Sequence, residues 1–122
     1  MSERNTLLLL KDISESIQNI FDFTSGLSFE DYCSDIKTKH AVEHNFMIIG
    51  EAVSRIPDSF KTRYKEVDWR IIKDFRNVMV HDYFGIDNNI VWDIIQFHLR
   101  ELSIDISRVL ENETGDNSKF SS

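Results

Sequence analysis

Apolar residues recur at steps of three and four along most of the chain, a period that predicts amphipathic helices. No stretch alternates apolar and polar positions for long enough to predict a sheet. The first helix is expected from Thr6 to about Ser25, and Gly26 after it is a typical helix end. Its apolar face consists of Leu7, Leu10, Ile13, Ile17, Ile20 and Phe21.

A second long helix is expected from about Ile36 to Ile56, and its apolar arc is wide. An arc of this width predicts contacts on two sides, such as the core of the same chain and a second subunit. Pro57 either ends this helix or starts the next turn at Asp58. Two neighbouring stripes make up the arc: Ala41, Asn45, Ile48, Ala52 and Ile56 form one, and Val42, Phe46, Ile49 and Val53 form the other.

Capping residues predict the starts of further helices. Ser28, three residues before Asp31, predicts a capping box and a short helical turn. Asp68 is the expected N-cap of a helix that begins at Trp69. Asp87 is the expected N-cap of a last helix that reaches about Leu110. The buried side of the Trp69 helix is expected to be Ile71, Ile72, Phe75, Val78 and Met79, with Tyr83 as a further candidate before Gly85 ends the helix. The buried side of the last helix is expected to be Val91, Ile94, Ile95, Leu99, Leu102, Ile106, Val109 and Leu110.

These elements predict an all-α fold, a four-to-five-helix up-and-down bundle over residues 1–111, with dimerisation through helix faces as one use of the wide apolar arc, followed by a flexible polar tail over residues 112–122. A length of 122 residues is typical of one domain. The single cysteine excludes an internal disulfide. No apolar run approaches the roughly 20 residues of a membrane span. We therefore expect a cytoplasmic protein with no membrane segment.

The net charge of −7 argues against a protein that coats nucleic acid through bulk electrostatics. The charge is uneven, however. Residues 61–76 carry six basic and three acidic side chains, a local balance of +3 that leaves the rest of the chain at −10. A solvated helix face and a phosphate-binding rim both explain this basic stretch.

The basic stretch leads into the segment RNVMVHDYFG at residues 76–85, which holds Arg76, His81 and Tyr83. Histidine exchanges a proton near neutral pH, and arginine binds phosphate through two parallel hydrogen bonds. Together they suit metal-independent RNA cleavage, in which a base activates a ribose 2′-hydroxyl and Arg76 stabilises the developing charge. On a regular helix, positions 76 and 81 lie roughly 140° apart. The two side chains converge only if the helix ends or distorts between them, or if two copies meet; a purely structural role also stays open.

The pattern Arg, four residues, His, any residue, Tyr resembles the signature of the HepT-like branch of the HEPN superfamily, which consists of small helical proteins. The resemblance extends over roughly residues 5 to 110. It includes GLSFEDY at 26–32, IIGEAVSRI at 48–56, VDWRIIKDFRNVMVHDYFGID at 67–87 and IVWDII at 90–95.

The resemblance implies a ribonuclease toxin of a two-gene toxin–antitoxin system, with no cofactor. Arg76 and His81 correspond to the catalytic pair, and the toxin is a homodimer whose two motifs face a shared cleft. The antitoxin is a minimal nucleotidyltransferase (MntA-like) that attaches AMP to the tyrosine, here Tyr83. Asn77 and Asp82 are candidates for positioning the catalytic side chains. In such a dimer Arg70 and Lys73 would add positive charge around the RNA substrate.

An alternative function is a non-catalytic helical module that binds the nucleotidyltransferase and serves as its target or substrate-binding subunit. Glu51, on a largely apolar helix, is a candidate to pair with a motif arginine or to line the cleft. His40 and His44 share a helix face and could bind zinc, but no third ligand is obvious, and exposed polar residues are the simpler interpretation.

Overall fold

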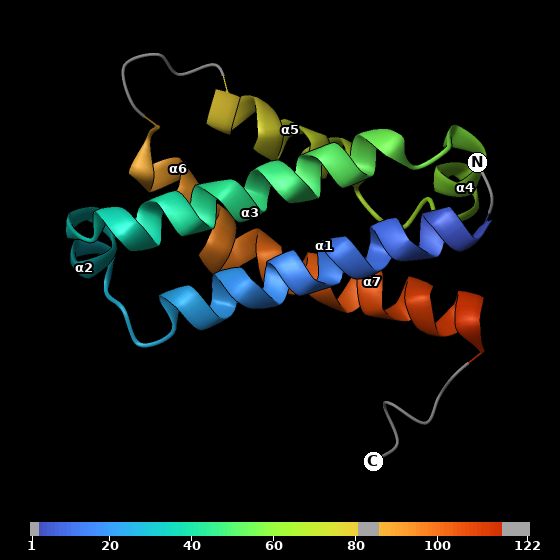
Figure 1. The fold of residues 1–122 in the computed structure, drawn as a ribbon, viewed down its shortest axis with the longest axis horizontal. Helices are drawn as coiled ribbons and strands as arrows, with labels where there is room; N and C mark the ends of the chain where they lie inside the picture. Colours follow the sequence, from blue (N-terminus) through green and yellow to red (C-terminus); the bar gives the residue numbers. More distant parts are fainter. Residues whose placement is uncertain (1–2, 81–85, 116–122) are drawn as a thin grey trace.

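The chain folds into antiparallel helices arranged as an up-and-down bundle (Figure 1). The computed structural model describes residues 3–80 and 86–115, and this part contains helices and no strand, which confirms the predicted all-α class. The long helices are α1 (Glu3–Thr24), α3 (Ile36–Arg55), α5 (Trp69–Val80) and a last segment made of α6 (Asn88–Asp93), η1 (Ile94–His98) and α7 (Leu99–Thr114). The short helices α2 (Phe29–Ser34) and α4 (Asp58–Arg63) lie in the connections.

Helix α3 packs against α1 on one side and α5 on the other, and α1 also packs against α7. Both predicted stripes of α3 contribute buried residues, including Phe46 and Asn45. The ring of Phe46 meets that of Phe75 on α5 edge to face, with centroids 5.4 Å apart. Asn45 accepts a hydrogen bond from Asn19 of α1 at 3.1 Å. The wide arc of α3 therefore has a neighbour within the same chain on each side.

Side-chain caps start the helices where the sequence predicts them. The Ser28–Asp31 capping box is present, with hydrogen bonds of 3.1 and 3.2 Å. Asp68 accepts from the backbone N–H of Ile71 at 3.1 Å, and Asp87 caps α6 in the same way. Each such cap contributes typically about 1 kcal/mol of stability. Gly26, with φ of +78°, allows the chain to turn after α1.

Two predictions about these helices are wrong in detail. The last helix extends to Thr114, four residues beyond the expected Leu110, and ends at Gly115 with φ of +65°. Ile71, predicted to be buried, is 37% exposed because it lines an open groove beside His98 instead of the core.

A hydrogen-bonded cluster explains the longer last helix. The Tyr64 hydroxyl donates to the Glu113 carboxylate and accepts from the Asn112 side-chain amide. Burial, followed by the bond to Glu113, raises the pKa of the Tyr64 phenol, so it stays protonated and keeps donating. The indole N–H of Trp69 donates to the backbone carbonyl of Tyr64 at 3.0 Å. The cluster ties the α4–α5 connection to the end of α7.

The last helical segment is not uniform, because residues Ile94–His98 form a π-helical turn. A π turn holds about one residue more than an α turn. Ile94, Ile95 and Leu99 are all buried around this wider turn. The apolar spacing does not distinguish it from a regular helix, so the sequence does not predict it.

Within the described ranges no helix is both long enough and apolar enough to cross a membrane.

We expect Phe46→Ala to lower the free energy of unfolding by about 3–5 kcal/mol, because it leaves a cavity where α3 meets α5. Phe46 is fully buried, whereas Phe23 on α1 is 42% exposed. Phe23→Ala is the matched control and should change stability by less than about 1 kcal/mol. Urea unfolding of both variants measures the difference, and losses of similar size would contradict the central position of Phe46.

Candidate functional site

The motif begins on α5, which is helical from Trp69 to Val80. His81, Asp82 and Tyr83 lie outside the described residues, as does the side chain of Arg76. The backbone of α5 has no break between Arg76 and Val80. The described part of the chain therefore offers no helix distortion that would bring positions 76 and 81 together within one copy.

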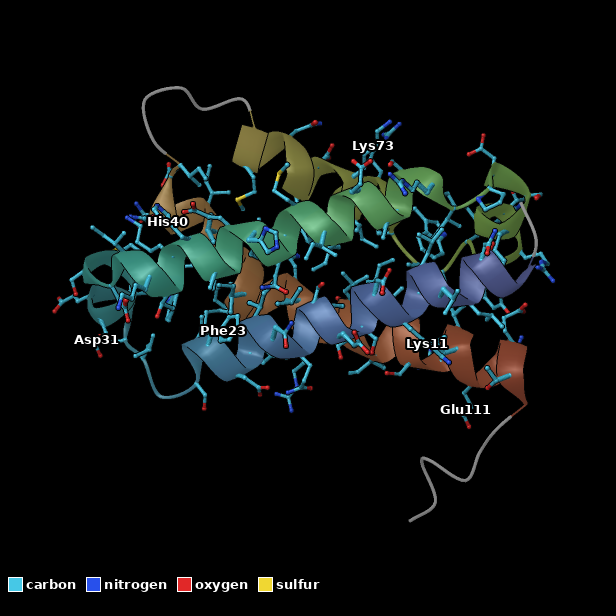
Figure 2. The ribbon with its side chains drawn as sticks, viewed as in Figure 1. Lys11, Phe23, Asp31, His40, Lys73 and Glu111 are labelled. Atoms are coloured by element: carbon cyan, nitrogen blue, oxygen red, sulfur yellow. The ribbon has the colours of Figure 1, made fainter. Side chains whose placement is uncertain are left out.

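The outer face of α5 carries Arg70 and Lys73, which are expected to bind substrate, and Asn77, which is expected to position the catalytic side chains. Arg70, Lys73 and Asn77 are all exposed, and their spacing of three and four places them on one side of the helix. Lys73 points away from the bundle (Figure 2). These side chains are thus available to a ligand that lies along α5.

Arg63, from the same predicted basic stretch, is placed elsewhere. Arg63 on α4 lies over the ring of Phe60, 5.1 Å from its centroid, and 3.7 Å from the carboxylate of Glu113. It therefore belongs to the cluster that anchors the end of α7. The fold separates one predicted basic stretch into a structural part at α4 and an open part on α5.

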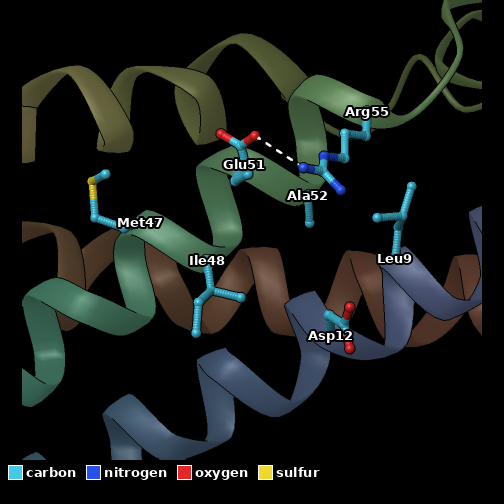
Figure 3. Close-up of a pocket in the computed structure, with 7 residues that line it drawn as sticks. All are labelled: Leu9, Asp12, Met47, Ile48, Glu51, Ala52 and Arg55. Atoms are coloured by element: carbon cyan, nitrogen blue, oxygen red, sulfur yellow. Dashed lines mark ion pairs between the residues drawn. The ribbon is translucent and has the colours of Figure 1, made fainter.

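Glu51 lines a groove of about 350 Å³ between α1 and α3 (Figure 3). Leu9 and Asp12 border it from α1, and Ile48 and Arg55 border it from α3. The carboxylate of Glu51 lies 3.5 Å from the guanidinium of Arg55, one turn along the same helix. Both side chains are about half exposed, so this ion pair contributes little stability. The groove combines an apolar floor with charges of both signs on its rim.

The end of the bundle next to the motif is aromatic. The C-terminal end of α5 and the start of α6 lie at the same end as α2 (Figure 1). There the rings of Phe29 and Tyr32 pack on Trp92 of α6, with centroids 6.0 and 5.3 Å apart. Trp92 is half-buried and packs against the core.

In the parts of the chain that the structure describes, no group of three or more His, Cys, Asp or Glu side chains is arranged to hold a metal ion. His40 and His44 are both exposed on α3 (Figure 2 labels His40).

A second groove, of about 120 Å³, is acidic, and sequence reasoning missed it. Its rim consists of Glu66, Asp68, His98, Glu101 and Asp105, and its floor includes Phe75 and Leu102. Burial, and then the charges of Glu101 and Glu66, raise the pKa of Asp105. The guanidinium of Arg108 lies 3.9 Å from the Asp105 carboxylate, and its positive charge only partly offsets this increase in pKa. These acids come from distant parts of the chain, so only the folded structure brings them together.

The chain matches the family described as ribonuclease HepT-like over residues 13–109. A protein of Thermococcus cleftensis named as a probable ribonuclease HepT is 40% identical over 87 residues, which cover 71% of this chain and 79% of that protein. A protein of Methanocaldococcus jannaschii named as a candidate RNase is 37% identical over 95 residues, 78% of each chain. Another named as a candidate RNase, from Caldanaerobacter subterraneus, is 31% identical over 104 residues, covering 85% of this chain and 93% of its own. No solved structure matches the chain significantly.

We expect Asp105→Asn to raise the free energy of unfolding at pH 7, because the amide has no charge to bury beside Glu101 and Glu66. A raised carboxyl pKa favours the folded state below the ordinary value of about 4, and this advantage is lost as the pH rises through the raised value. The gain from Asp105→Asn should therefore be small below about pH 4 and largest at neutral pH. Urea unfolding below about pH 4 and at neutral pH measures this gain in the free energy of unfolding. Asp93→Asn, at an exposed carboxylate on the same helical segment, is the control. A gain of equal size at both pH values would contradict this account.

Proposed function

Since this chain belongs to the HepT-like ribonuclease family, we propose that it is a metal-independent endoribonuclease that cleaves cellular RNA with Arg76 and His81. The observation that carries the proposal is the family match over residues 13–109, because it spans the whole motif. Arginine, histidine and tyrosine all stand at their motif positions. The exposed Arg70 and Lys73 on the same helix support a path for the RNA backbone along α5.

In the proposed mechanism His81 removes the proton from a ribose 2′-hydroxyl. The 2′-oxygen attacks the adjacent phosphorus, and the bond from phosphorus to the 5′-oxygen breaks. Arg76 stabilises the negative charge that develops on the phosphate oxygens, and the departing 5′-oxygen takes up a proton. Asn77, Asp82 and Glu51 are proposed to support these groups.

We propose a homodimer because a continuous helix would place positions 76 and 81 on different sides, whereas two copies can supply both groups to one cleft. Exposed apolar surface supports a partner. Phe97 is 71% exposed, and the groove beside Glu51 has an apolar floor. Two copies of Arg70 and Lys73 would make the cleft positive on an otherwise acidic, cytoplasmic protein.

The proposed regulation is a toxin–antitoxin switch. A minimal nucleotidyltransferase antitoxin transfers AMP to the hydroxyl of Tyr83 and releases pyrophosphate from ATP. The added group brings bulk and negative charge to the motif, so it competes with the substrate phosphate for Arg76.

We expect His81→Ala to reduce RNA cleavage by about 100-fold or more, because the general base is lost. Helix content and oligomeric mass should stay unchanged. His40→Ala and His44→Ala remove exposed histidines outside the motif and should keep the parental rate. Cleavage of a labelled RNA in the presence of a chelator measures all three variants. A His81→Ala variant that cuts at the parental rate would rule out the proposed mechanism.

Co-expression with the nucleotidyltransferase should add one or more AMP units to the protein and abolish cleavage. Tyr83→Phe should stay unmodified and active, because only the phenolic oxygen is lost. Tyr64→Phe, at a buried hydroxyl, should still be modified. Intact-mass spectrometry and the RNA assay on the same samples provide the measurement. Modified but fully active protein would contradict the switch. Binding of the nucleotidyltransferase without any RNase activity of the parental chain would support the non-catalytic module instead.

A further inference from the structure

Two buried polar atoms at the α2–α6 end of the bundle have no hydrogen-bond partner among the described residues. They are the hydroxyl oxygen of Tyr32 and the side-chain carbonyl oxygen of Asn88. Tyr32 is fully buried. An unpaired buried polar group costs about 1–3 kcal/mol, and a phenylalanine at position 32 would fill the same space without this cost. The hydroxyl therefore indicates an interaction that the described protein atoms do not supply.

Tyr32 and Asn88 are both related to Trp92, the first by a ring contact and the second by its position on the same helix. The ring of Tyr32 lies 5.3 Å from that of Trp92 on α6. Asn88 precedes Trp92 by four residues, so both side chains project from the same side of the helix. Their chemistry is complementary, because the phenol can donate a hydrogen bond and the amide oxygen can only accept one. A small polar molecule between them would satisfy both.

Glu43 on α3 brings a third polar group to this place. Burial, and then the negative charge of Glu43, raises the pKa of the Tyr32 phenol far above its ordinary value. Glu43 lies on α3, which packs directly against α2, the helix that carries Tyr32. Glu43 is itself partly buried, and burial raises its own pKa. Three helices thus contribute one donor and two acceptors to this end of the bundle.

We propose that one buried water molecule joins Tyr32, Glu43 and Asn88. The water accepts a hydrogen bond from the Tyr32 hydroxyl and donates its two hydrogens to the Asn88 carbonyl oxygen and the Glu43 carboxylate. Three hydrogen bonds are the usual number for a buried water, and removing such a water is costly. The bridge fixes the first turn of α6 against α2 and α3.

This bridge has a consequence for the motif, which rests on the proposed function. Asn88 opens α6 after Ile86 and Asp87, which follow the segment that contains His81 and Tyr83. Holding Asn88 fixes the point at which the chain leaves the motif. Tyr32 and Asn88 are therefore positioning residues, which act on the catalytic groups through the backbone and touch no substrate.

The sign of one stability change tests the water bridge. Removal of a truly unpaired hydroxyl should stabilise the protein, whereas loss of a bridged hydroxyl should lower the Tm of Tyr32→Phe by about 3–6 °C. Tyr64→Phe, whose hydroxyl has two partners, is the positive control for a loss. Asn88→Ala should lower the Tm more in the parental chain than in the Tyr32→Phe variant. The reason is that the Tyr32→Phe variant has already lost the network to which Asn88 belongs. A raised or unchanged Tm of Tyr32→Phe, or strictly additive losses, would overturn the bridge.

Two further measurements separate the bridge from the proposed function. A high-resolution crystal structure of the full chain should show a water within hydrogen-bond distance of all three groups, and its absence would overturn the proposal. In the RNA assay Tyr32→Phe should lower kcat several-fold with KM unchanged, as expected of a positioning residue. An unchanged kcat would overturn the positioning role. If the parental chain cuts no RNA, the proposed function fails, while the Tm and the crystal structure still decide the bridge.

Discussion

The packing of α3 against α1 on one side and α5 on the other is the constraint on which the rest of the structure depends. A helix with two apolar stripes needs two partners, and here both belong to the same chain. Phe46 contacts α5 and Asn45 contacts α1, so one helix sets the places of its two neighbours. Because α5 carries Arg76, the burial of α3 also determines where the motif starts.

The sequence predicts those parts of the fold that depend on local interactions. The caps at Ser28, Asp68 and Asp87 form between residues two or three positions apart, so their signals are visible in the chain itself. The cluster of Tyr64 with Glu113 joins residues 49 positions apart, and no local sequence pattern indicates it. The π turn escapes prediction for another reason, since its apolar residues also fit a regular helix.

The sequence predicts the candidate site through the types of its residues more than through their spacing along the chain. The combination of Arg76, His81 and Tyr83 predicts the chemistry, but periodicity alone places the first two on different sides of a helix. The charge pattern is informative only after folding. Arg63 belongs to a structural cluster, whereas Arg70 and Lys73 remain exposed on α5. The acidic groove around Asp105 gathers charges that look scattered in the chain.

The π turn at Ile94–His98 bears on how the length of this chain can vary. Because a π turn contains about one residue more than an α turn, deleting one residue there would yield a regular α-helix with α7 in its present orientation. A deletion elsewhere in the last helix would instead rotate all following residues by about 100°. Leu102 and Ile106 would then leave the core. The last helix thus contains one place where the deletion of a residue is structurally mild, while its other positions tolerate substitutions better than changes of length.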